Sequence, residues 1–280
     1  MIDPEKVKSV RIAACDLNGQ MRGKRLPGFE KKKFKDGSIR MPLSALNVDI
    51  FGADIEDSPL VFETGDQDGL LKITSRGVLP IPWLKNPTAL APVSMFTDHG
   101  EPFEGDPRHA LERIMKNYDS KGLKAIAATE MEFYLIDERK TSLLPPINPI
   151  SRQRLSTPNV LGISELDCFD DFFSDLQNGC EQIGITVQSI TSESGCGQFE
   201  VTLKHCDALT ASDDAWLFKL LTKGLARKHG IAATFMAKPY LQDAGNGMHI
   251  HFSIIDRNGN NIFNNNRNEG SKLLKSAVAG

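Results

Sequence analysis

The fold is decided by residues 238–254, which read KPYLQDAGNGMHIHFSI. Residues 245–247, Gly-Asn-Gly, predict a turn, because glycine tolerates positive φ and lets the backbone approach a ligand closely. The following run, 248–254, alternates as a β-strand does, so one face carries His249, His251 and Ser253. The other face carries Met248, Ile250, Phe252 and Ile254. We expect the apolar face to pack in a core and the polar face to form a site, although a lone His-x-His would fit a solvent-facing hairpin edge better.

Four glutamates elsewhere in the chain favour a site. Glu130 and Glu132 lie two residues apart in the strand-like run ATEMEFYLI, so both carboxylates project from one face of a half-buried sheet. Glu193 and Glu200 flank a glycine-containing segment, SESGCGQFE, that opens another apolar strand. Taken singly, each would be a solvated charge. Together with His249 they suggest a cage for divalent cations, because carboxylate oxygens favour Mg²⁺ or Mn²⁺ and Mn²⁺ also accepts an imidazole.

Four motifs, in this order, resemble those of glutamine synthetases. They are Glu-x-Glu-Phe-Tyr-Leu from Glu130, Glu193 with Gly-x-Gly-Gln-Phe-Glu ending at Glu200, Lys238-Pro239, and Asn-Gly-Met-His-x-His-x-Ser from Asn246. Within that family, DAGNGMHIHFS and the N-terminal CDLNGQMRGKRLP resemble the γ-glutamylamine and γ-glutamylpolyamine synthetase branch. The resemblance covers most of the chain.

The resemblance implies ligands for two metal ions, Mg²⁺ or Mn²⁺. The positions that match the ligands of one ion are Glu132, Glu193 and Glu200. Two ligands of the second ion match Glu130 and His249, and its third ligand is expected beyond Gly280. We expect the chain to be cut within a helix that starts near Ser271, and the family's arginines for the phosphates and for glutamate are also expected beyond it. We therefore expect the 280 residues alone to be inactive.

The resemblance also implies the substrates. His251 and Ser253 match contacts to ATP, and Gly245 matches a backbone contact to glutamate. The implied reaction activates the γ-carboxylate of glutamate as a γ-glutamyl phosphate, which an amine or ammonium then displaces. Ala244 stands where glutamine synthetases commonly have Asn, and residues 41–46 replace the loop that bears an ammonium-site aspartate, which favours a larger amine. No residue is assigned as a catalytic acid or base. The alternative is a non-catalytic structural or regulatory relative.

Composition adds exclusions. The chain has 280 residues, 40% hydrophobic and 25% charged, with a formal net charge of −3. This balance favours neither a nucleic-acid nor a membrane partner. The N-terminus has no apolar signal region and no stretch approaches the ~20 apolar residues of a spanning helix, so we expect a cytoplasmic protein. Five cysteines without a CxxC pair fit reduced, packed thiols better than a zinc site or disulfides. Cys196 lies in the proposed site loop, but no histidine is local to it, so we expect it to pack rather than react.

The expected fold class is α+β in two domains. Residues 1–105 are expected to form a small β-grasp-like N-terminal domain, with a hairpin turn at Asn18-Gly19. Residues 106–280 are expected to form the incomplete N-terminal part of a catalytic domain, a curved antiparallel sheet with outer helices. Helices are predicted from Asp106 to Gly122, over 165–184 and over 211–230, and a long loop over 138–160. The resemblance implies a homo-oligomer, a dodecamer, with active sites between subunits.

Overall fold

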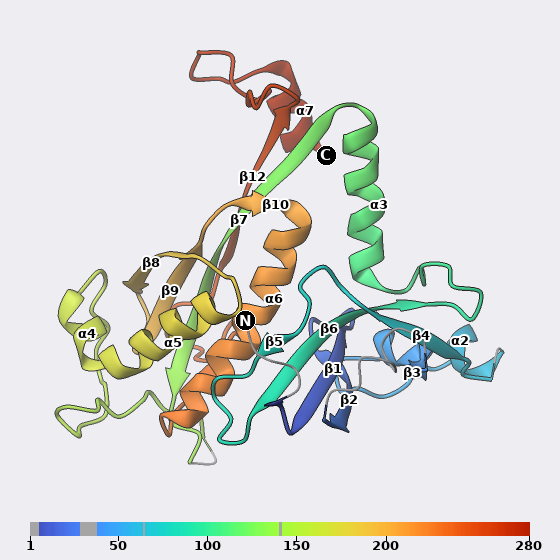
Figure 1. Ribbon diagram of the computed structural model, residues 1–280. Helices are drawn as coiled ribbons and strands as arrows, with labels where there is room; N and C mark the ends of the chain where they lie inside the picture. The colour runs from blue at the N-terminus through green and yellow to red at the C-terminus, as the bar shows by residue number, and fades with distance from the viewer. Residues whose placement is uncertain (1–5, 29–37, 64, 140–141) are drawn as a thin grey trace. The chain divides into compact units, whose positions relative to one another are not determined.

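The protein separates into two compact units. The computed structural model describes residues 6–28, 38–63, 65–139 and 142–280. Contacts divide the chain into Met1–Ile114 and Met115–Gly280. This division falls inside helix α3 (Pro107–Ser120) (Figure 1). The domain boundary predicted at residues 105–106 lies just before that helix and stays a prediction.

The first unit is built on one mixed sheet. Its strands are β1 (Ser9–Cys15), β2 (Met21–Pro27), β3 (Arg40–Pro42), β4 (Asp68–Ile73), β5 (Leu79–Pro80) and β6 (Thr88–Phe96). Their order is β2-β1-β6-β4-β3, with β5 also on β6, and only β1 and β6 run parallel. Gly19 turns the predicted hairpin between β1 and β2 with a φ of 70°. Two parallel central strands with antiparallel neighbours on either side agree with the predicted β-grasp-like sheet.

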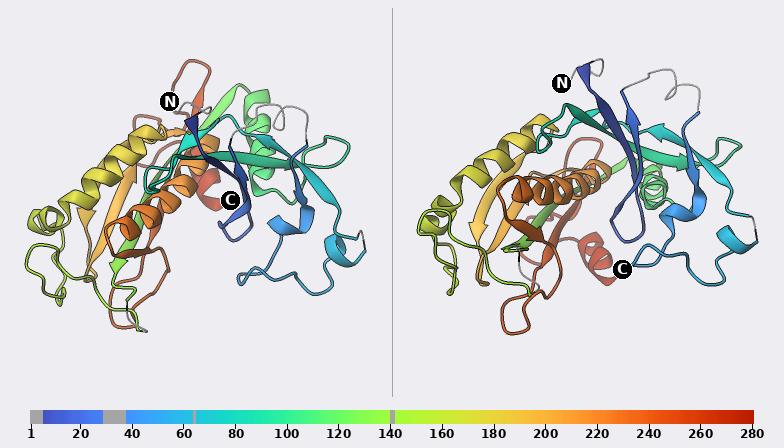
Figure 2. Two further views of the ribbon diagram at one scale, coloured as in Figure 1. Left: turned by 60° about the horizontal axis from the view of Figure 1, so that its bottom comes forward. Right: turned by 90° about the horizontal axis from the view of Figure 1, so that it is seen from below.

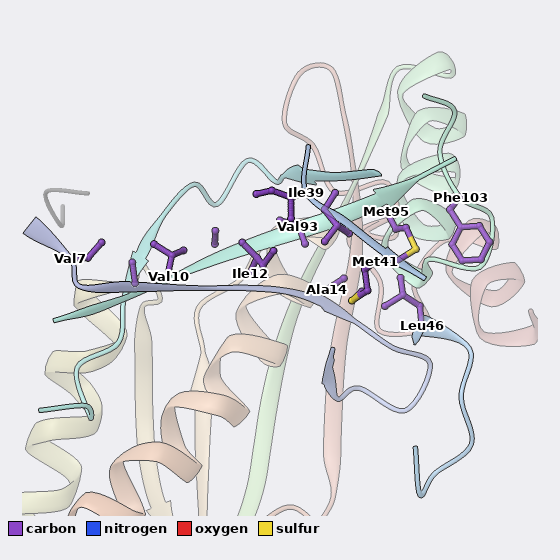
Figure 3. Close-up of a cluster of buried hydrophobic side chains, with 13 residues drawn as sticks. Val7, Val10, Ile12, Ala14, Ile39, Met41, Leu46, Val93, Met95 and Phe103 are labelled. Atoms are coloured by element: carbon purple, nitrogen blue, oxygen red, sulfur yellow. The ribbon is translucent and has the colours of Figure 1, made fainter. Parts of the chain in front are cut away.

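Apolar side chains from both ends of this unit's sequence form its core (Figure 3). They come from β1, β3, β4 and β6, the short helix η2 (Leu43–Leu46) and the segment before α3. The members are Val7, Val10, Ile12, Ala14, Ile39, Met41, Leu46, Leu71, Ala89, Ala91, Val93, Met95 and Phe103. A second short helix, α2 (Pro59–Phe62), follows η2. The core therefore fixes β1 against β6, strands almost eighty residues apart in the chain.

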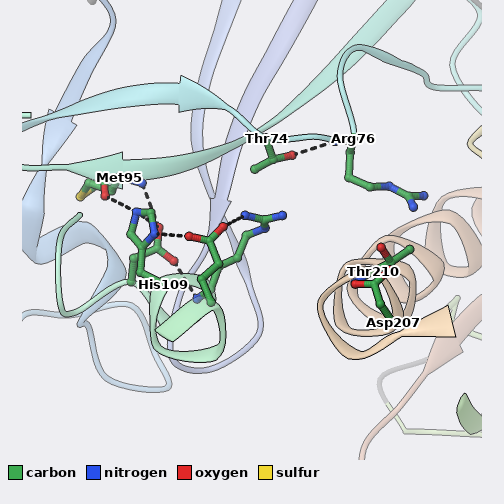
Figure 4. A network of polar contacts seen from close by, with 9 residues as sticks. Thr74, Arg76, Met95, His109, Asp207 and Thr210 are labelled. Carbon is green, nitrogen blue, oxygen red and sulfur yellow. Dashed lines mark hydrogen bonds and ion pairs between the residues drawn. The ribbon is translucent and has the colours of Figure 1, made fainter. Parts of the chain in front are cut away.

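Helix α3 begins where its sequence predicts. The carboxylate of Asp106 accepts hydrogen bonds from the backbone N–H of Arg108 and, through its other oxygen, from that of Met95, both at 2.9 Å. Buried His109 adds a second tie, because Nε2 lies 2.9 Å from the Met95 carbonyl oxygen and Nδ1 lies 2.9 Å from Glu112 Oε2 (Figure 4). These bonds anchor the start of α3 to β6.

The second unit is organised around one long strand, β7 (Leu123–Ile136). The other strands are β8 (Val187–Ser192), β9 (Gln198–Leu203), β10 (Cys206–Asp207), β11 (Ala232–Thr234) and β12 (Met248–Asp256). The order is β10-β7-β9-β8, and β11 and β12 also pair with β7. Every pairing in this sheet is antiparallel. β7 thus receives four other strands along its 14 residues.

Helices α5 (Asp170–Gln182) and α6 (Ala208–Lys228) lie together on one face of this sheet (Figures 1 and 2). The remaining helices are α4 (Ile163–Cys168) and α7 (Lys272–Ala279). The predicted helix over 165–184 is in fact two helices, because the chain turns at Phe169, whose ring packs 5.6 Å from that of Phe199 in β9. No helix in the described residues is long and apolar enough to cross a membrane.

Aromatic side chains fill the space between this sheet and its helices. Phe133 is fully buried, with ring centroids 5.4 Å from Phe235, 6.3 Å from Phe218 and 6.4 Å from Phe199. Because side chains alternate along a strand, Glu130 and Glu132 must point to the opposite face. Packing of the helix face therefore orients the carboxylates.

The apolar face of β12 does not enter a core as expected. Met248, Ile250 and Phe252 are 52%, 62% and 44% exposed, and only Ile254 is buried. Antiparallel pairing puts Met248 beside Met131, on the helix face of the sheet. However, α6 packs on β7 and β11, and within the described residues β12 pairs with β7 alone. The strand therefore lies at an edge that no described helix covers.

Candidate functional site

Strand register brings the predicted ligands together. His249 of β12 is directly opposite Glu130 of β7, and Glu132 is directly opposite Glu200 of β9. Directly opposed residues of antiparallel strands share a face, with Cβ atoms about 5 Å apart. Three neighbouring strands, β12, β7 and β9, therefore present an imidazole and three carboxylates on the face away from the helices.

Glu130, Glu200 and His249 form a cluster that could hold a cation, which we call the cation triad. One ligand atom from each lies within 4.8 Å of the others. Nδ1 of His249 is 3.1 Å from Glu130 Oε2 and 3.9 Å from Glu200 Oε2. Nε2 of His251 lies 2.8 Å from the other Glu130 oxygen, Oε1. Both oxygens of Glu130 therefore face a histidine.

The carboxylates of the triad differ in proton affinity. The hydrogen bond from His251 lowers the pKa of Glu130, with further contributions from the charges of His251 and His249. Burial raises the pKa of Glu200, and the charges of Glu130, Glu193 and Glu132 raise it further. Excess negative charge therefore gathers around Glu200, an arrangement that a divalent cation would relieve.

Glu132 is held by hydrogen bonds and lies outside the triad. Its Oε2 accepts from the backbone N–H of Gly247 at 2.9 Å and from Nε2 of Gln198 at 3.0 Å. A Cβ at position 247 would lie 2.9 Å from Oε1 of Glu132, so glycine lets this backbone approach the carboxylate without displacing it. The turn residue predicted from sequence thus serves to contact a carboxylate.

Glu193 is also outside the triad but close to it. It lies in the β8–β9 hairpin, where its N–H donates to the Gln198 carbonyl at 2.8 Å, and its charge contributes to the raised pKa of Glu200. The structure thus groups Glu200 with Glu130 and His249, whereas the resemblance groups it with Glu132 and Glu193. Which ion each ligand serves stays a prediction.

His251 and Ser253, the residues predicted to contact ATP, line one cavity of about 400 Å³. The remaining lining residues are mostly apolar: Ile126, Ala127, Ala128, His205, Phe252, Ile255 and Asn261. Because His251 also contacts Glu130, this cavity adjoins the cation triad. A flat apolar group could enter the cavity while a charged group stays near the triad.

The loop that contains Gly245 is fixed from three directions. The Gly245 carbonyl accepts a hydrogen bond from Gln198 Nε2 at 2.9 Å, and the Ala244 carbonyl accepts one from the Tyr134 hydroxyl at 2.7 Å. The Cys196 N–H donates to Asp243 Oδ2 at 3.0 Å. Burial makes the largest contribution to the pKa of the Cys196 thiol, which is raised to about 11. A thiol that stays protonated at neutral pH is a poor nucleophile, which agrees with packing. All five cysteines are free thiols.

Sequence reasoning left two of these residues without a role, Gln198 and Tyr134. Gln198 lies inside a quoted motif, and its signal was a polar residue among the buried positions of a strand. Tyr134 follows Glu130 and Glu132 at the same two-residue spacing, so it had to share their face. The partner of Tyr134 and three of the four side-chain partners of Gln198 lie more than forty residues away in the chain, which no local pattern reveals.

A family model described as the catalytic domain of glutamine synthetase matches residues 104–280. The chain belongs to the glutamine synthetase family. This confirms the family predicted from the four motifs. Within the family, the chain is similar to ligases whose names specify an amine, as its branch prediction stated.

Three curated relatives illustrate the similarity. The chain is 35% identical to gamma-glutamylputrescine synthetase PuuA of Escherichia coli (strain K12), over 97% of this chain and 58% of the relative. It is 30% identical to glutamate–isopropylamine ligase of a Pseudomonas species, over 96% and 59%. It is 28% identical to glutamine synthetase of Thermotoga maritima, over 100% and 60%. The chain therefore spans 58% to 60% of the length of these relatives.

Solved structures share the fold. The crystal structure of a novel glutamine synthase homolog matches with a TM-score of 0.82 at 22% identity, over 98% of this chain and 62% of that one. GmaS without ligand matches with a TM-score of 0.80 at 24% identity, over 98% and 60%. The predicted α+β fold of the glutamine synthetase type is confirmed.

Proposed function

We propose that this chain belongs to a ligase that joins the γ-carboxylate of glutamate to an amine, with ATP converted to ADP. The observation that carries the proposal is the cation triad beside the cavity lined by His251 and Ser253. Phosphoryl transfer needs cations at the phosphates and a place for the base of the nucleotide, and this arrangement offers both on one face of a sheet.

The donor set suits Mg²⁺ or Mn²⁺. Two carboxylates and one imidazole whose ligand atoms lie within 4.8 Å of one another match the ligands that Mn²⁺ accepts, and the unneutralised charge at Glu200 supports a cation there. Glu130, Glu200 and His249 would hold one ion, with Glu132 and Glu193 serving a neighbouring one. When bound, the ions neutralise phosphoryl oxygens and align attacking and leaving groups.

The chain's own residues would arrange the substrates. His251 and Ser253 would contact ATP, and the Gly245 carbonyl would accept a hydrogen bond from the ammonium group of glutamate. In the first step a γ-carboxylate oxygen bonds to the γ-phosphorus and the bond to the ADP oxygen breaks. In the second, the amine nitrogen bonds to the acyl carbon, phosphate leaves and the nitrogen loses a proton.

We propose an organic amine rather than ammonium as the nucleophile. Two relatives are named for putrescine and isopropylamine. Ala244 and residues 41–46 depart from the glutamine synthetase pattern at the positions named above, and 41–46 fold as the end of β3 and the helix η2. An ammonium pocket without the usual aspartate would favour a larger nucleophile.

Further proposals concern organisation. We propose residues 1–105 and 106–280 as the functional domains, a cytoplasmic location, and a homo-oligomer, a dodecamer, with active sites between subunits. Exposed apolar side chains in the first unit support association: Ile50 is 75%, Phe51 92% and Phe62 67% exposed. Apolar side chains that are exposed to this degree favour burial against another chain.

The test is ATP turnover with glutamate and a panel of amines, including ammonium. It compares the 280-residue chain with a chain extended to the length of the relatives. We expect the extended chain to form ADP when an organic amine is present and to use ammonium poorly. The 280 residues alone should form no ADP. If neither chain turns over ATP while both bind Mn²⁺, the non-catalytic alternative is favoured.

A further inference from the structure

Gln198 joins three parts of the site through one side chain. It is the first residue of β9 and is 1% exposed. Its Nε2 lies 3.0 Å from Glu132 Oε2, 2.9 Å from the Gly245 carbonyl oxygen and 3.0 Å from Asn246 Oδ1. Its Oε1 accepts from the Gly195 N–H at 2.9 Å. A buried strand residue thus links β7, the β8–β9 hairpin and the 243–247 loop.

The orientation of this amide is fixed by its partners. A flipped amide would place oxygen against three acceptors and an N–H group against the Gly195 N–H. Asn246 cannot reverse its own amide to compensate, because its Nδ2 donates to the Met236 carbonyl at 2.8 Å. Nε2 has two hydrogens, which the Glu132 carboxylate and the Gly245 carbonyl use, with Asn246 sharing one.

The bond to Glu132 decides how that carboxylate can bind a cation. Oε2 already accepts two N–H groups, one from Gln198 and one from Gly247, and these leave it little capacity for a metal ion. Oε1 remains for a ligand. Glu132 would therefore bind a cation through Oε1 alone. The two hydrogen bonds to Oε2 prevent the carboxylate from rotating.

We propose that Gln198 is a positioning residue that couples cation binding at Glu132 to amino-acid binding at the Gly245 carbonyl. This rests on the proposed function, because both ligands come from it. The physical basis is that one rigid amide donates to both groups, so a cation that fixes Glu132 also fixes the Gly245 carbonyl. Hydrogen bonds to a charged carboxylate are stronger than those between neutral groups, so the connection from Gln198 to Glu132 is stiff.

The experiment measures the dissociation constant of L-glutamate for the 280-residue chain, with and without saturating Mn²⁺. We expect Mn²⁺ to tighten glutamate binding about fivefold or more, a typical coupling. Gln198→Met keeps the length of the side chain and removes its hydrogen bonds. The ratio of the glutamate dissociation constant without Mn²⁺ to that with Mn²⁺ should then fall to about one. Gln188→Met, on the neighbouring strand β8 with an exposed side chain, is the matched control and should keep the ratio.

Two further measurements separate positioning from a general loss of structure. Gln198→Glu keeps the acceptor that the Gly195 N–H uses but replaces the donor, so it should lose the coupling without losing Mn²⁺ affinity. Amide hydrogen exchange should show that Mn²⁺ protects residues 244–246, which do not donate to Glu132 themselves, in the unmodified chain and not in Gln198→Met. Circular dichroism and melting curves identify any variant that fails to fold.

The outcomes are distinct. An unchanged ratio in folded Gln198→Met, or protection of 244–246 by Mn²⁺ in that variant, overturns the coupling. If the unmodified chain binds Mn²⁺ but no glutamate, the exchange measurement alone decides about Gln198, and the turnover experiment decides about the proposed function. Absence of any Mn²⁺ effect on 244–246 in the unmodified chain also overturns the inference.

Discussion

Glu130 and Glu132 stand two residues apart on one face of β7 and meet different partners. Both oxygens of Glu130 contact side chains of β12, His249 and His251. Glu132 is held by two N–H groups that belong to the fold. Glu130 can therefore exchange its hydrogen-bond partners, whereas Glu132 is held in place, although the two residues have almost the same neighbours in sequence.

Substitutions in the triad should weaken cation binding far more than loss of the nearby thiol. His249→Ala or Glu200→Gln removes one of three ligands, so Mn²⁺ affinity should fall at least about tenfold. Cys196→Ala should leave it nearly unchanged, because its thiol is buried and protonated. Electron paramagnetic resonance of free Mn²⁺ measures the affinity. Loss of binding in Cys196→Ala with normal binding in His249→Ala would contradict our assignment of the site.

Glu165→Gln should stabilise the protein at neutral pH. Glu165 is 8% exposed, burial raises its pKa above 4.5, and its carboxylate meets no hydrogen-bond or ion-pair partner among the described residues. The folded state then holds this proton more tightly than the unfolded state, so the charged group costs stability above its folded pKa and nothing below about 4.5. We expect a gain of about 1 kcal/mol at pH 7.5.

Urea unfolding at several pH values tests this prediction. The gain should shrink as pH falls through the folded pKa of Glu165. Glu181→Gln, at an exposed position in α5, should show no such trend. A destabilised Glu165→Gln at pH 7.5 would mean that the carboxylate has a favourable partner.

At the scale of elements, β12 is an edge strand with an apolar face open to solvent. Such edges promote association between chains, which natural proteins suppress with charged side chains. Ile250→Lys places a charge on the exposed face, away from His249 and His251. We expect less self-association in light scattering and a change in unfolding free energy within about 0.5 kcal/mol. A loss of several kcal/mol would show that Ile250 is buried in solution.

Much of the site could be predicted from two-residue alternation. It placed Glu130 with Glu132, and His249 with His251, on single faces, and the family motifs identified Glu200. It could not show that β12 lies beyond the helices, because coverage of a strand depends on where α6 packs. It could not show the break at Phe169, which tertiary packing on Phe199 produces. The contacts of Gln198 were equally hidden, since they join loops distant in sequence.

At the scale of the whole molecule, the acidic cluster should make stability depend on cations. Two carboxylates about 5 Å apart repel by roughly 3 kcal/mol at an effective dielectric constant of ~20. A ligand that binds only the folded state stabilises it by about 2.7 kcal/mol at one hundred times its dissociation constant. Mn²⁺ or Mg²⁺ should therefore raise the melting temperature by several degrees.

Differential scanning calorimetry over millimolar metal measures this effect. His249→Ala is the control, since it should retain the fold and lose most of the shift. An unchanged melting curve for the unmodified chain would count strongly against an assembled cation site.

The central position of β7 also sets a schedule for biosynthesis. Glu130 contacts His249 across 119 residues of sequence, so the ribosome must finish β12 before the triad can exist. At about 5–20 residues per second, Glu130 waits roughly 6–24 s for its partner. During that time β7 has an unoccupied edge and its carboxylates have no imidazole beside them. Nascent chains of this family are therefore exposed to mispairing for seconds, and a slow codon between residues 136 and 248 would lengthen that exposure.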